Sequence, residues 1–325
     1  MTYYNYLLDI GKGGTQANIS QAVLKQVDIP IPPLPEQHRI VAKLDALMEK
    51  VESSRQRLEK IPVLLKRFRQ SVLAAAVSGR LTEDWRRKRK ISKKWEVLKA
   101  TEACETVACG STPKGKPFFI TGDIPYLKVY NIVNQRIDFF YKPQYIKKNV
   151  HEKELKRSKI YPNDVLINIV GPPLGKVAIV PDSFKEWNIN QALVVFRPKN
   201  LLLNKYLYYI LCNGEQIREI ELELRGTVGQ SNISLSQCRN FSFSVPPIEE
   251  QVKIVKRVEL LFEKSDQIEL NLNKLKVMFD KLPQTILLKA FRGELVPQDP
   301  SDEPASVLLE RIRGEKEKKR DTKML

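Results

Sequence analysis

One apolar pattern occurs twice in this chain, and it constrains the fold more than any other feature of the sequence. Between Glu36 and Ser78, apolar residues recur at alternating steps of four and three, and one serine, Ser54, interrupts the row. The same row returns 214 residues later, again with one serine, Ser265. A sustained 4-3 spacing is typical of a coiled-coil seam. Each helix would be about 65 Å long, so we expect the two to pack on each other outside any compact core.

We expect the two helices to pack on each other and to place large apolar side chains in one seam. Each helix contains an interior proline, Pro62 or Pro283, which normally bends a helix. Because the apolar spacing continues through both prolines, we expect kinks rather than turns. Gly79 and Gly293 follow the two patterns, as glycine commonly follows a helix C-terminus. The predicted seam residues are Leu44, Leu47, Leu58 and Leu65 in the first helix and Leu261, Leu272, Leu275 and Phe279 in the second.

The repeat extends beyond the helices on both sides. Its period is too long for a solenoid, so two copies indicate a duplicated unit of one domain and one helix. The second unit runs from about residue 95 to residue 295, and the first lacks a counterpart of residues 95–214. Pairs that share the offset of 214 include Asn18 and Asn232, Pro32 and Pro246, Glu36 and Glu250, and Ala76 and Ala290.

The two copies of the repeat predict an α+β protein in which two long helices form a coiled coil beside a globular domain. Short strand-like segments at 118–120, 125–130, 165–169, 177–180 and 192–196 precede a helix at 201–220. A closing strand at 241–245 has its twin at 27–31. We expect the tail to be frayed, because it is highly charged. The predicted parts are a domain remnant at 1–35, the first helix at 36–80, a basic linker at 81–94, the complete domain at 95–248, the second helix at 249–295 and a charged tail at 296–325.

The charge of the chain favours a polyanionic partner. The formal net charge is +17 and the pI is about 9.6, which is most often the balance of a nucleic-acid-binding protein. The alternative explanation of the charge is that soluble proteins of the source organism are generally basic. The sequence contains no run of 18 apolar residues, so no membrane span is expected. It also shows no secretory signal pattern, so we expect a cytoplasmic location. The four cysteines lack paired short spacing and are expected to be reduced.

The sequence offers little for catalysis. Its two histidines, His38 and His151, are far apart, and no cysteine–histidine group has zinc spacing. No glycine-rich phosphate loop with Lys-Ser/Thr occurs. Asn168 is separated from Pro172 and Pro173, so the Asn-Pro-Pro-aromatic motif of adenine methyltransferases is not formed. We therefore predict no catalytic residues, no metal and no cofactor.

Three segments carry residue types that contact nucleic acid. Flexible basic loops can approach phosphates, asparagine can bond adenine, and tyrosine can stack or bond phosphate. The same residues could instead be ordinary turn residues. The predicted DNA-binding residues are Ser111, Thr112, Lys114 and Lys116 in the first loop, Lys128, Tyr130, Asn131 and Asn134 in the second segment, and Arg225 and Gln230 before the closing strand.

Several motifs together resemble those of one family. They are Trp95-Glu96-Val97, Gly110-Ser111-Thr112-Pro113, Gly122-Asp123-Ile124-Pro125, Gly175-Lys176-Val177-Ala178 and Pro246-Pro247-Ile248-Glu249-Glu250-Gln251. Over almost its whole length the chain resembles the specificity subunits of type I restriction–modification systems. The resemblance implies a non-catalytic subunit with target-recognition domains that each read one half of a split DNA site. It also implies that the two long helices form an antiparallel coiled coil. This helix pair would set the spacing between half-sites and dock methyltransferase subunits, which motor-nuclease subunits join.

The chain departs from this family pattern in one respect. It holds one recognition domain and a fragment of another, where the family pattern has two. We expect either a homodimer or pairing with a complementary half-subunit. The alternative hypothesis is a scaffold remnant that grips the methyltransferase without specifying a DNA sequence.

Overall fold

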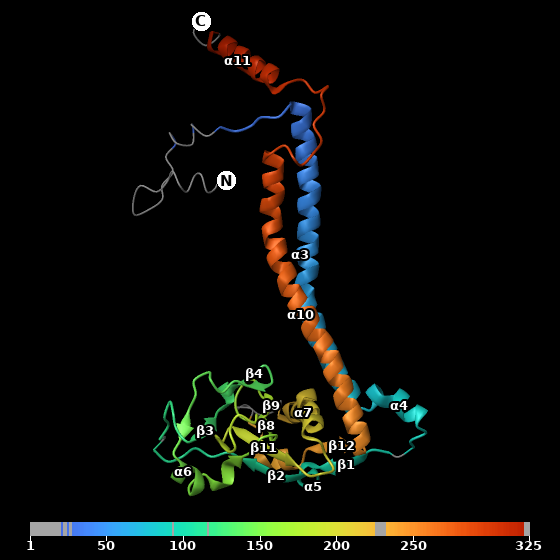
Figure 1. The fold of residues 1–325 in the computed structure, drawn as a ribbon, viewed down its shortest axis with the longest axis vertical. Coiled ribbons are helices and arrows are strands. Elements are labelled where there is room, and N and C mark those ends of the chain that lie inside the picture. The colour runs from blue at the N-terminus through green and yellow to red at the C-terminus, as the bar shows by residue number, and fades with distance from the viewer. Residues whose placement is uncertain are drawn as a thin grey trace. The chain divides into compact units, whose positions relative to one another are not determined.

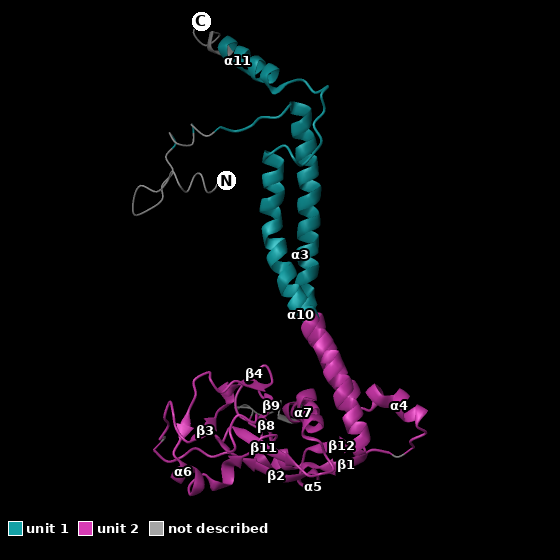
Figure 2. Cartoon of the chain, in the orientation of Figure 1, with its two compact units in different colours: residues 1–63, 268–325 teal, residues 64–267 magenta. Residues whose placement is uncertain are grey.

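The computed structural model describes residues 21, 25, 28–92, 94–115, 117–224 and 232–321 (Figure 1). The chain divides into two compact units, one of residues 1–63 with 268–325 and one of residues 64–267 (Figure 2). Both long helices contribute to both units, because the boundary falls within them. Among the described residues, no helix is both long and apolar enough to cross a lipid bilayer.

The two long helices begin and end close to the predicted positions. Helix α3 spans Leu34–Val77 and helix α10 spans Ile248–Phe291. Neither helix breaks at its interior proline, so the expectation that no turn forms there is confirmed. Gly79 and Gly293 follow with positive φ angles of 78° and 71°, a conformation that glycine adopts without steric cost.

In the first unit, the parts of α3 and α10 lie side by side (Figure 2). Arg39 pairs with Asp302 at 2.6 Å, and Arg55 pairs with Asp280 at 3.7 Å. Arg39 lies near the start of α3 and its partner follows α10, whereas Arg55 lies further along α3 and its partner lies within α10. The two helices therefore run antiparallel. Helix α11, Ala305–Asp321, completes this unit. The expectation of a frayed tail is therefore wrong for these residues. They form a helix because leucine, glutamate, lysine and arginine are all strong helix formers.

In the second unit, the remaining parts of the two helices are joined by a buried polar contact. Arg69 Nε donates to Ser265 Oγ at 2.9 Å, and Arg69 Nη2 reaches Asp266 Oδ1 at 2.7 Å. Ser265 is fully buried and is the serine that interrupts the second apolar row. Its hydroxyl thus has a partner on α3, which explains why a polar residue is tolerated in the seam.

The globular part of the second unit contains two four-stranded sheets and two strand pairs. One sheet has the order β2-β11-β8-β9 and is antiparallel throughout. The other has the order β6-β3-β10-β7 and contains one parallel pair, β3 with β10. The strands are β1 Glu96–Lys99, β2 Cys104–Cys109, β3 Ile124–Leu127, β4 Ile132–Val133, β5 Arg136–Ile137, β6 Tyr145–Ile146, β7 Lys159–Ile160, β8 Val165–Asn168, β9 Val177–Ile179, β10 Trp187–Ile189, β11 Leu193–Pro198 and β12 Ser242–Val245.

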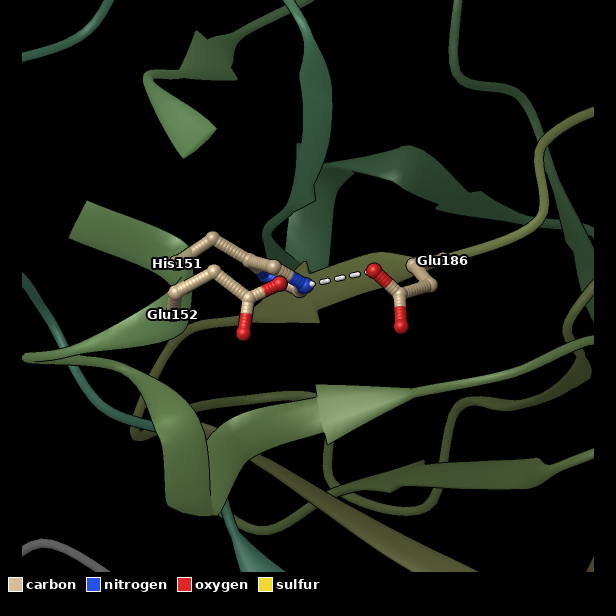
Figure 3. A group of neighbouring side chains, drawn as sticks. All are labelled: His151, Glu152 and Glu186. Atoms are coloured by element: carbon tan, nitrogen blue, oxygen red, sulfur yellow. Dashed lines mark hydrogen bonds and ion pairs between the residues drawn. The ribbon is translucent and has the colours of Figure 1, made fainter. Parts of the chain in front are cut away.

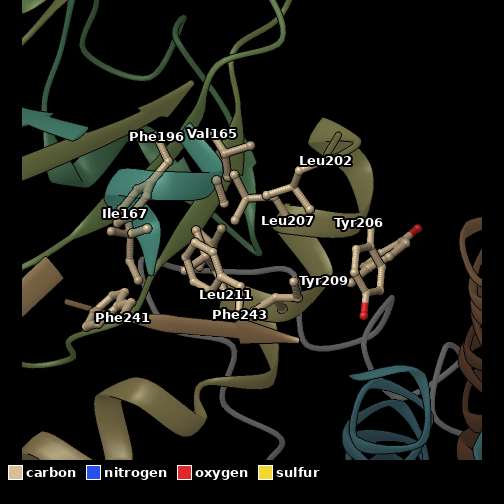
Figure 4. Packing of buried hydrophobic residues seen from close by; sticks show 14 of the residues in the cluster. Val165, Ile167, Phe196, Leu202, Tyr206, Leu207, Tyr209, Leu211, Phe241 and Phe243 are labelled. Carbon is tan, nitrogen blue, oxygen red and sulfur yellow. The ribbon is translucent and has the colours of Figure 1, made fainter. Parts of the chain in front are cut away.

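Short helices connect these strands, and some of them pack against the first sheet. They are η1 Arg80–Thr82, α4 Glu83–Lys88, α5 Ala100–Ala103, η2 Val129–Asn131, α6 Lys148–Glu152, η3 Lys156–Ser158, α7 Asn204–Asn213, α8 Glu215–Leu224 and α9 Leu235–Arg239. Helix α7 places Leu207 and Leu211 against Phe196 of β11 and Phe243 of β12, all of them almost fully buried (Figure 4). A separate core of Trp187, Phe139 and their neighbours supports the second sheet.

Several predicted elements differ in the structure. The helix expected at 201–220 is two helices, because Gly214 adopts a left-handed φ of 70° between them. The strand expected at 118–120 is a single bridge from Phe119 to Tyr145. Residues 28–31 form no strand, and Val27 lies outside the described residues. In the second copy β12 pairs with β1, whose counterpart would fall before residue 1.

Residues of the basic linker make specific contacts with helix α10. Thr82 Oγ1 donates to Glu250 Oε1 at 2.6 Å, Trp95 Nε1 donates to Glu250 Oε2 at 3.0 Å, and Arg86 pairs with the same carboxylate. Asp84 pairs with Arg257 of α10. Three linker residues and Trp95, which directly follows the linker, therefore bind the first part of α10 and fix the domain to it.

Candidate nucleic-acid interface

The structure brings part of the first predicted loop to the end of strand β3. Tyr126 Oη donates to the carbonyl oxygen of Ser111 at 2.7 Å and lies 3.5 Å from Thr112 Oγ1. The Thr112 hydroxyl donates to Gln191. Lys128, which directly follows β3, holds its Nζ 4.2 Å from the centre of the Phe118 ring. Ser111, Thr112 and Lys128 thus belong to one connected surface.

Burial raises the pKa of Tyr126 to about 12. Its hydroxyl therefore stays protonated at neutral pH and acts as a donor to the loop. The backbone N–H of Lys114 donates to Glu154 Oε1 at 2.6 Å, while the Lys114 side chain is exposed. The loop backbone is held by the domain, and the lysine charge remains directed to solvent.

Asn131 has a structural task in this site. Its side chain is 1% exposed. Its amide oxygen accepts from the backbone N–H of Lys128 at 3.0 Å, and its amide nitrogen donates to the carbonyls of Asp138 at 3.2 Å and Tyr141 at 3.0 Å. These bonds use the amide oxygen and the amide nitrogen that a contact with adenine would need. Asn131 therefore shapes the neighbouring turn, and the expectation that it contacts a base stays a prediction.

Two other predicted residues also shape turns. Asn134 and Gln135 have φ angles of 49° and 60° in the connection between β4 and β5, as a two-residue type I′ hairpin requires. Asn134 is exposed at this tip and remains available. Tyr130 Oη donates to the carbonyl of Lys142 at 3.3 Å, and its ring meets Tyr141 edge-on at 6.3 Å. Tyr130 therefore joins β3 to the turn at 138–142.

Three predicted DNA-binding residues, Lys116, Arg225 and Gln230, lie outside the described residues. For the described residues, the roles in DNA binding stay predictions. For the seam residues, the structure gives the degree of burial. Leu65 and Leu272 are buried, whereas Leu275 is 40% exposed. Intermediate exposure is found for Leu44, Leu47, Leu58, Leu261 and Phe279.

Sequence reasoning missed a group of exposed apolar residues beside the predicted site. Phe140 and Ile120 are each 80% exposed, and Tyr141 is 49% exposed. Lysines lie over neighbouring rings, with Lys142 Nζ 5.2 Å from the centre of Tyr141. The signal in the sequence was the run Asp138-Phe139-Phe140-Tyr141-Lys142, which combines aromatic and basic residues in a polar stretch.

One group of side chains has the composition of a metal site. His151, Glu152 and Glu186 bring one ligand atom each to within 4.8 Å of one another (Figure 3). Asn188 Nδ2 donates to His151 Nδ1 at 3.0 Å and to a backbone carbonyl at 3.2 Å, so the neutral imidazole carries its proton on Nε2. That N–H points at Glu186 Oε2, 3.2 Å away. Nε2 is thus engaged as a donor and has no lone pair for a cation.

The surroundings of this group favour the same assignment. Burial lowers the pKa of His151, with a further contribution from the positive charge of Lys159. Lys159 Nζ lies 2.6 Å from Glu152 Oε2, which neutralises that carboxylate. These contacts make the group a hydrogen-bonded support for α6. The four cysteines form no disulfide, and burial raises the pKa of Cys104, Cys212 and Cys238 to about 12, so they are inert thiols.

Comparison with known proteins places these features in context. The family profile described as "Type I restriction modification DNA specificity domain" matches residues 1–63 and 92–276. The Type I restriction enzyme EcoBI specificity subunit of Escherichia coli is 33% identical over 324 residues, covering 93% of this chain and 67% of the relative. The StySPI specificity subunit of Salmonella potsdam is 32% identical and covers 97% and 69%.

Solved structures share the fold. The HsdS subunit from Thermoanaerobacter tengcongensis superposes with a TM-score of 0.59 at 23% identity, covering 89% of this chain and 67% of that one. A chain from a structure titled as describing complex assembly and conformational transition of the type I R-M system gives a TM-score of 0.62 at 22% identity, covering 89% and 68%. Both matches support a fold with two long helices and a globular α+β domain.

Proposed function

Because this chain belongs to the type I restriction modification DNA specificity family, we propose that it recognises double-stranded DNA through the domain at 95–248. The observation that carries the proposal is the surface around the end of β3. There Ser111, Thr112, Lys128 and Tyr130 are linked by contacts through Tyr126, Phe118 and the turn at 138–142. Lysines on such a surface can bind phosphates and position the domain on a duplex.

The proposed target is one half of a bipartite site. A single domain of about 150 residues reads only a short segment of duplex, and the helix pair α3 and α10 would set the distance to whatever reads the other half. Methyltransferase subunits are the proposed partners along these helices. Motor-nuclease subunits would join through that assembly, and the specificity chain itself would perform no chemistry. Action on cellular DNA would place the chain in the cytoplasm.

A buried carboxylate supports the proposal of a further recognition domain. Glu36 is 3% exposed, and its Oε1 has no hydrogen-bond partner among the described residues. Its twin in the repeat, Glu250, accepts from Thr82 and Trp95 and pairs with Arg86. A domain docked at the start of α3 would supply equivalent donors. That domain could belong to the same polypeptide, to a complementary half-subunit or to a second copy in a homodimer.

The proposal is tested by selecting duplexes from a random pool with the purified chain, alone and with its methyltransferase subunits. We expect one short motif to be enriched, and we expect a variant with a foreign 95–248 domain to enrich a different one. A pool that stays random while the methyltransferase still co-purifies would instead support the scaffold remnant. The DNA-recognition proposal would then be wrong.

A further inference from the structure

The turn between β5 and β6 presents a large apolar side chain to water. Phe140 is 80% exposed, although burying a phenylalanine side chain is worth about 1.5–3 kcal/mol. The preceding residue, Phe139, is 4% exposed and makes edge-on contacts with Tyr145 at 5.2 Å and Trp187 at 5.3 Å. Consecutive phenylalanines therefore point in different directions, one into the core and one outward.

Hydrogen bonds hold the turn in this conformation. Asp138 Oδ1 accepts from the backbone N–H of Tyr141 at 3.2 Å. The buried amide of Asn131 donates to the carbonyls of Asp138 and Tyr141. Lys142 then takes a left-handed φ of 54°. A turn fixed at so many points keeps Phe140 from folding back onto the domain, so the ring is offered to a partner in a defined position.

The surroundings of the ring favour a nucleic acid as that partner. Lys142 lies over Tyr141, and Tyr130 connects the turn to Lys128 at the end of β3. The carboxylate within the turn, that of Asp138, accepts from the turn's own backbone. An outward aromatic ring two residues before an exposed lysine, in a chain of net charge +17, matches a polyanion with stacked bases better than it matches another basic protein surface.

We propose that Phe140 is a wedge that enters the base stack of the duplex bound by this domain. The inference rests on the proposed function and adds the mode of contact. Apolar side chains inserted between base steps unstack them and kink the duplex, at a cost of a few kcal/mol that added contacts offset. Reactions on a base require it to leave the stack, and an inserted ring can occupy the space that the base vacates.

The test measures binding of the full chain to two fluorescent duplexes of the same arbitrary sequence, one intact and one with a single central abasic site. An abasic site lacks one base of the stack, so a ring can enter there without the free-energy cost of unstacking. We expect the unaltered chain to bind the abasic duplex about tenfold more tightly, in line with the roughly 1–3 kcal/mol that stacking on one aromatic ring provides. The Phe140→Ala variant should bind both duplexes equally, and Phe140→Trp should retain the preference.

Phe291→Ala is the matched control, because Phe291 is also an exposed phenylalanine, 57% accessible at the end of α10. It should keep the preference for the abasic duplex. If Phe140→Ala retains that preference, the wedge is wrong while DNA recognition stands. If the unaltered chain binds neither duplex, both proposals fall. If Phe140→Ala binds both duplexes like the unaltered chain but no longer captures the methyltransferase, the ring belongs to a protein interface and the wedge is again refuted.

Discussion

The carboxylate of Glu250 offers a sharp test of how the recognition domain is fixed to α10. Glu250 is fully buried and binds Arg86, the Thr82 hydroxyl and the Trp95 indole N–H. The Glu250→Ala variant removes the carboxylate that accepts from all three donors. It leaves a guanidinium that is only 22% exposed without its buried partner. Breaking one side of such a pair costs about 3–5 kcal/mol.

The adjacent residue provides the control. Glu249 pairs with Arg89 at 3.1 Å, but these side chains are 77% and 58% exposed. Exposed pairs contribute about 0–1 kcal/mol, so Glu249→Ala should have little effect. In thermal unfolding followed by circular dichroism, each 1 kcal/mol corresponds to about 2–4 °C for a domain of this size. Glu250→Ala should therefore lower Tm by about 10 °C, and Glu249→Ala by no more than about 3 °C.

A double-mutant cycle separates the pair from general damage. Arg86→Ala added to Glu250→Ala should cost much less than the sum of the single changes, because the buried charge left unpaired in each single variant is then absent. Equal Tm values for Glu250→Ala and Glu249→Ala would refute the reasoning. So would strict additivity of the Arg86 and Glu250 changes.

Three further outcomes are expected. Lys114→Ala and Lys128→Ala should each weaken binding to all duplexes alike and lower the slope of log K against log salt by about 0.9 for each lost phosphate contact; an unchanged slope would remove that lysine from the interface. Leu272→Ala, at a residue 3% exposed, should cost about 2–5 kcal/mol in denaturant unfolding, whereas Leu270→Ala, at one 51% exposed, should cost far less. Burial lowers the pKa of His151, so the neutral imidazole contributes its full stabilisation above about pH 6.5, the pKa in the unfolded chain. That contribution is lost as pH falls through the lower pKa of the folded state. Tm should therefore drop below about pH 6.5, and the drop should be less steep in His151→Gln.

The long helices could be predicted from the sequence because their period is a local property. The 4-3 spacing and the following glycines gave bounds within a few residues of α3 and α10. The antiparallel direction is not fixed by this spacing, and it was expected only from the resemblance to the family. Strands such as β8 and β9 were recognised from β-branched runs bounded by turn residues.

The site was harder to predict because its residues act through tertiary contacts. Asn131 looked like a base reader, yet its amide is used by carbonyls seven and ten residues away. Phe139 and Phe140 are adjacent and chemically identical, and only the folded turn decides which one is buried. Arg86 appeared to be one of many linker charges until Glu250, 164 residues later, was placed against it.

The methylated bases of a host genome test the central claim most directly. Sequencing them with the gene present and with it deleted should show one motif that loses methylation on deletion. Restoring the gene with the 95–248 domain of a relative should bring back methylation at a different motif, because that domain reads the bases. Methylation that is unchanged by deletion, or that returns at the original motif with the exchanged domain, would contradict the account.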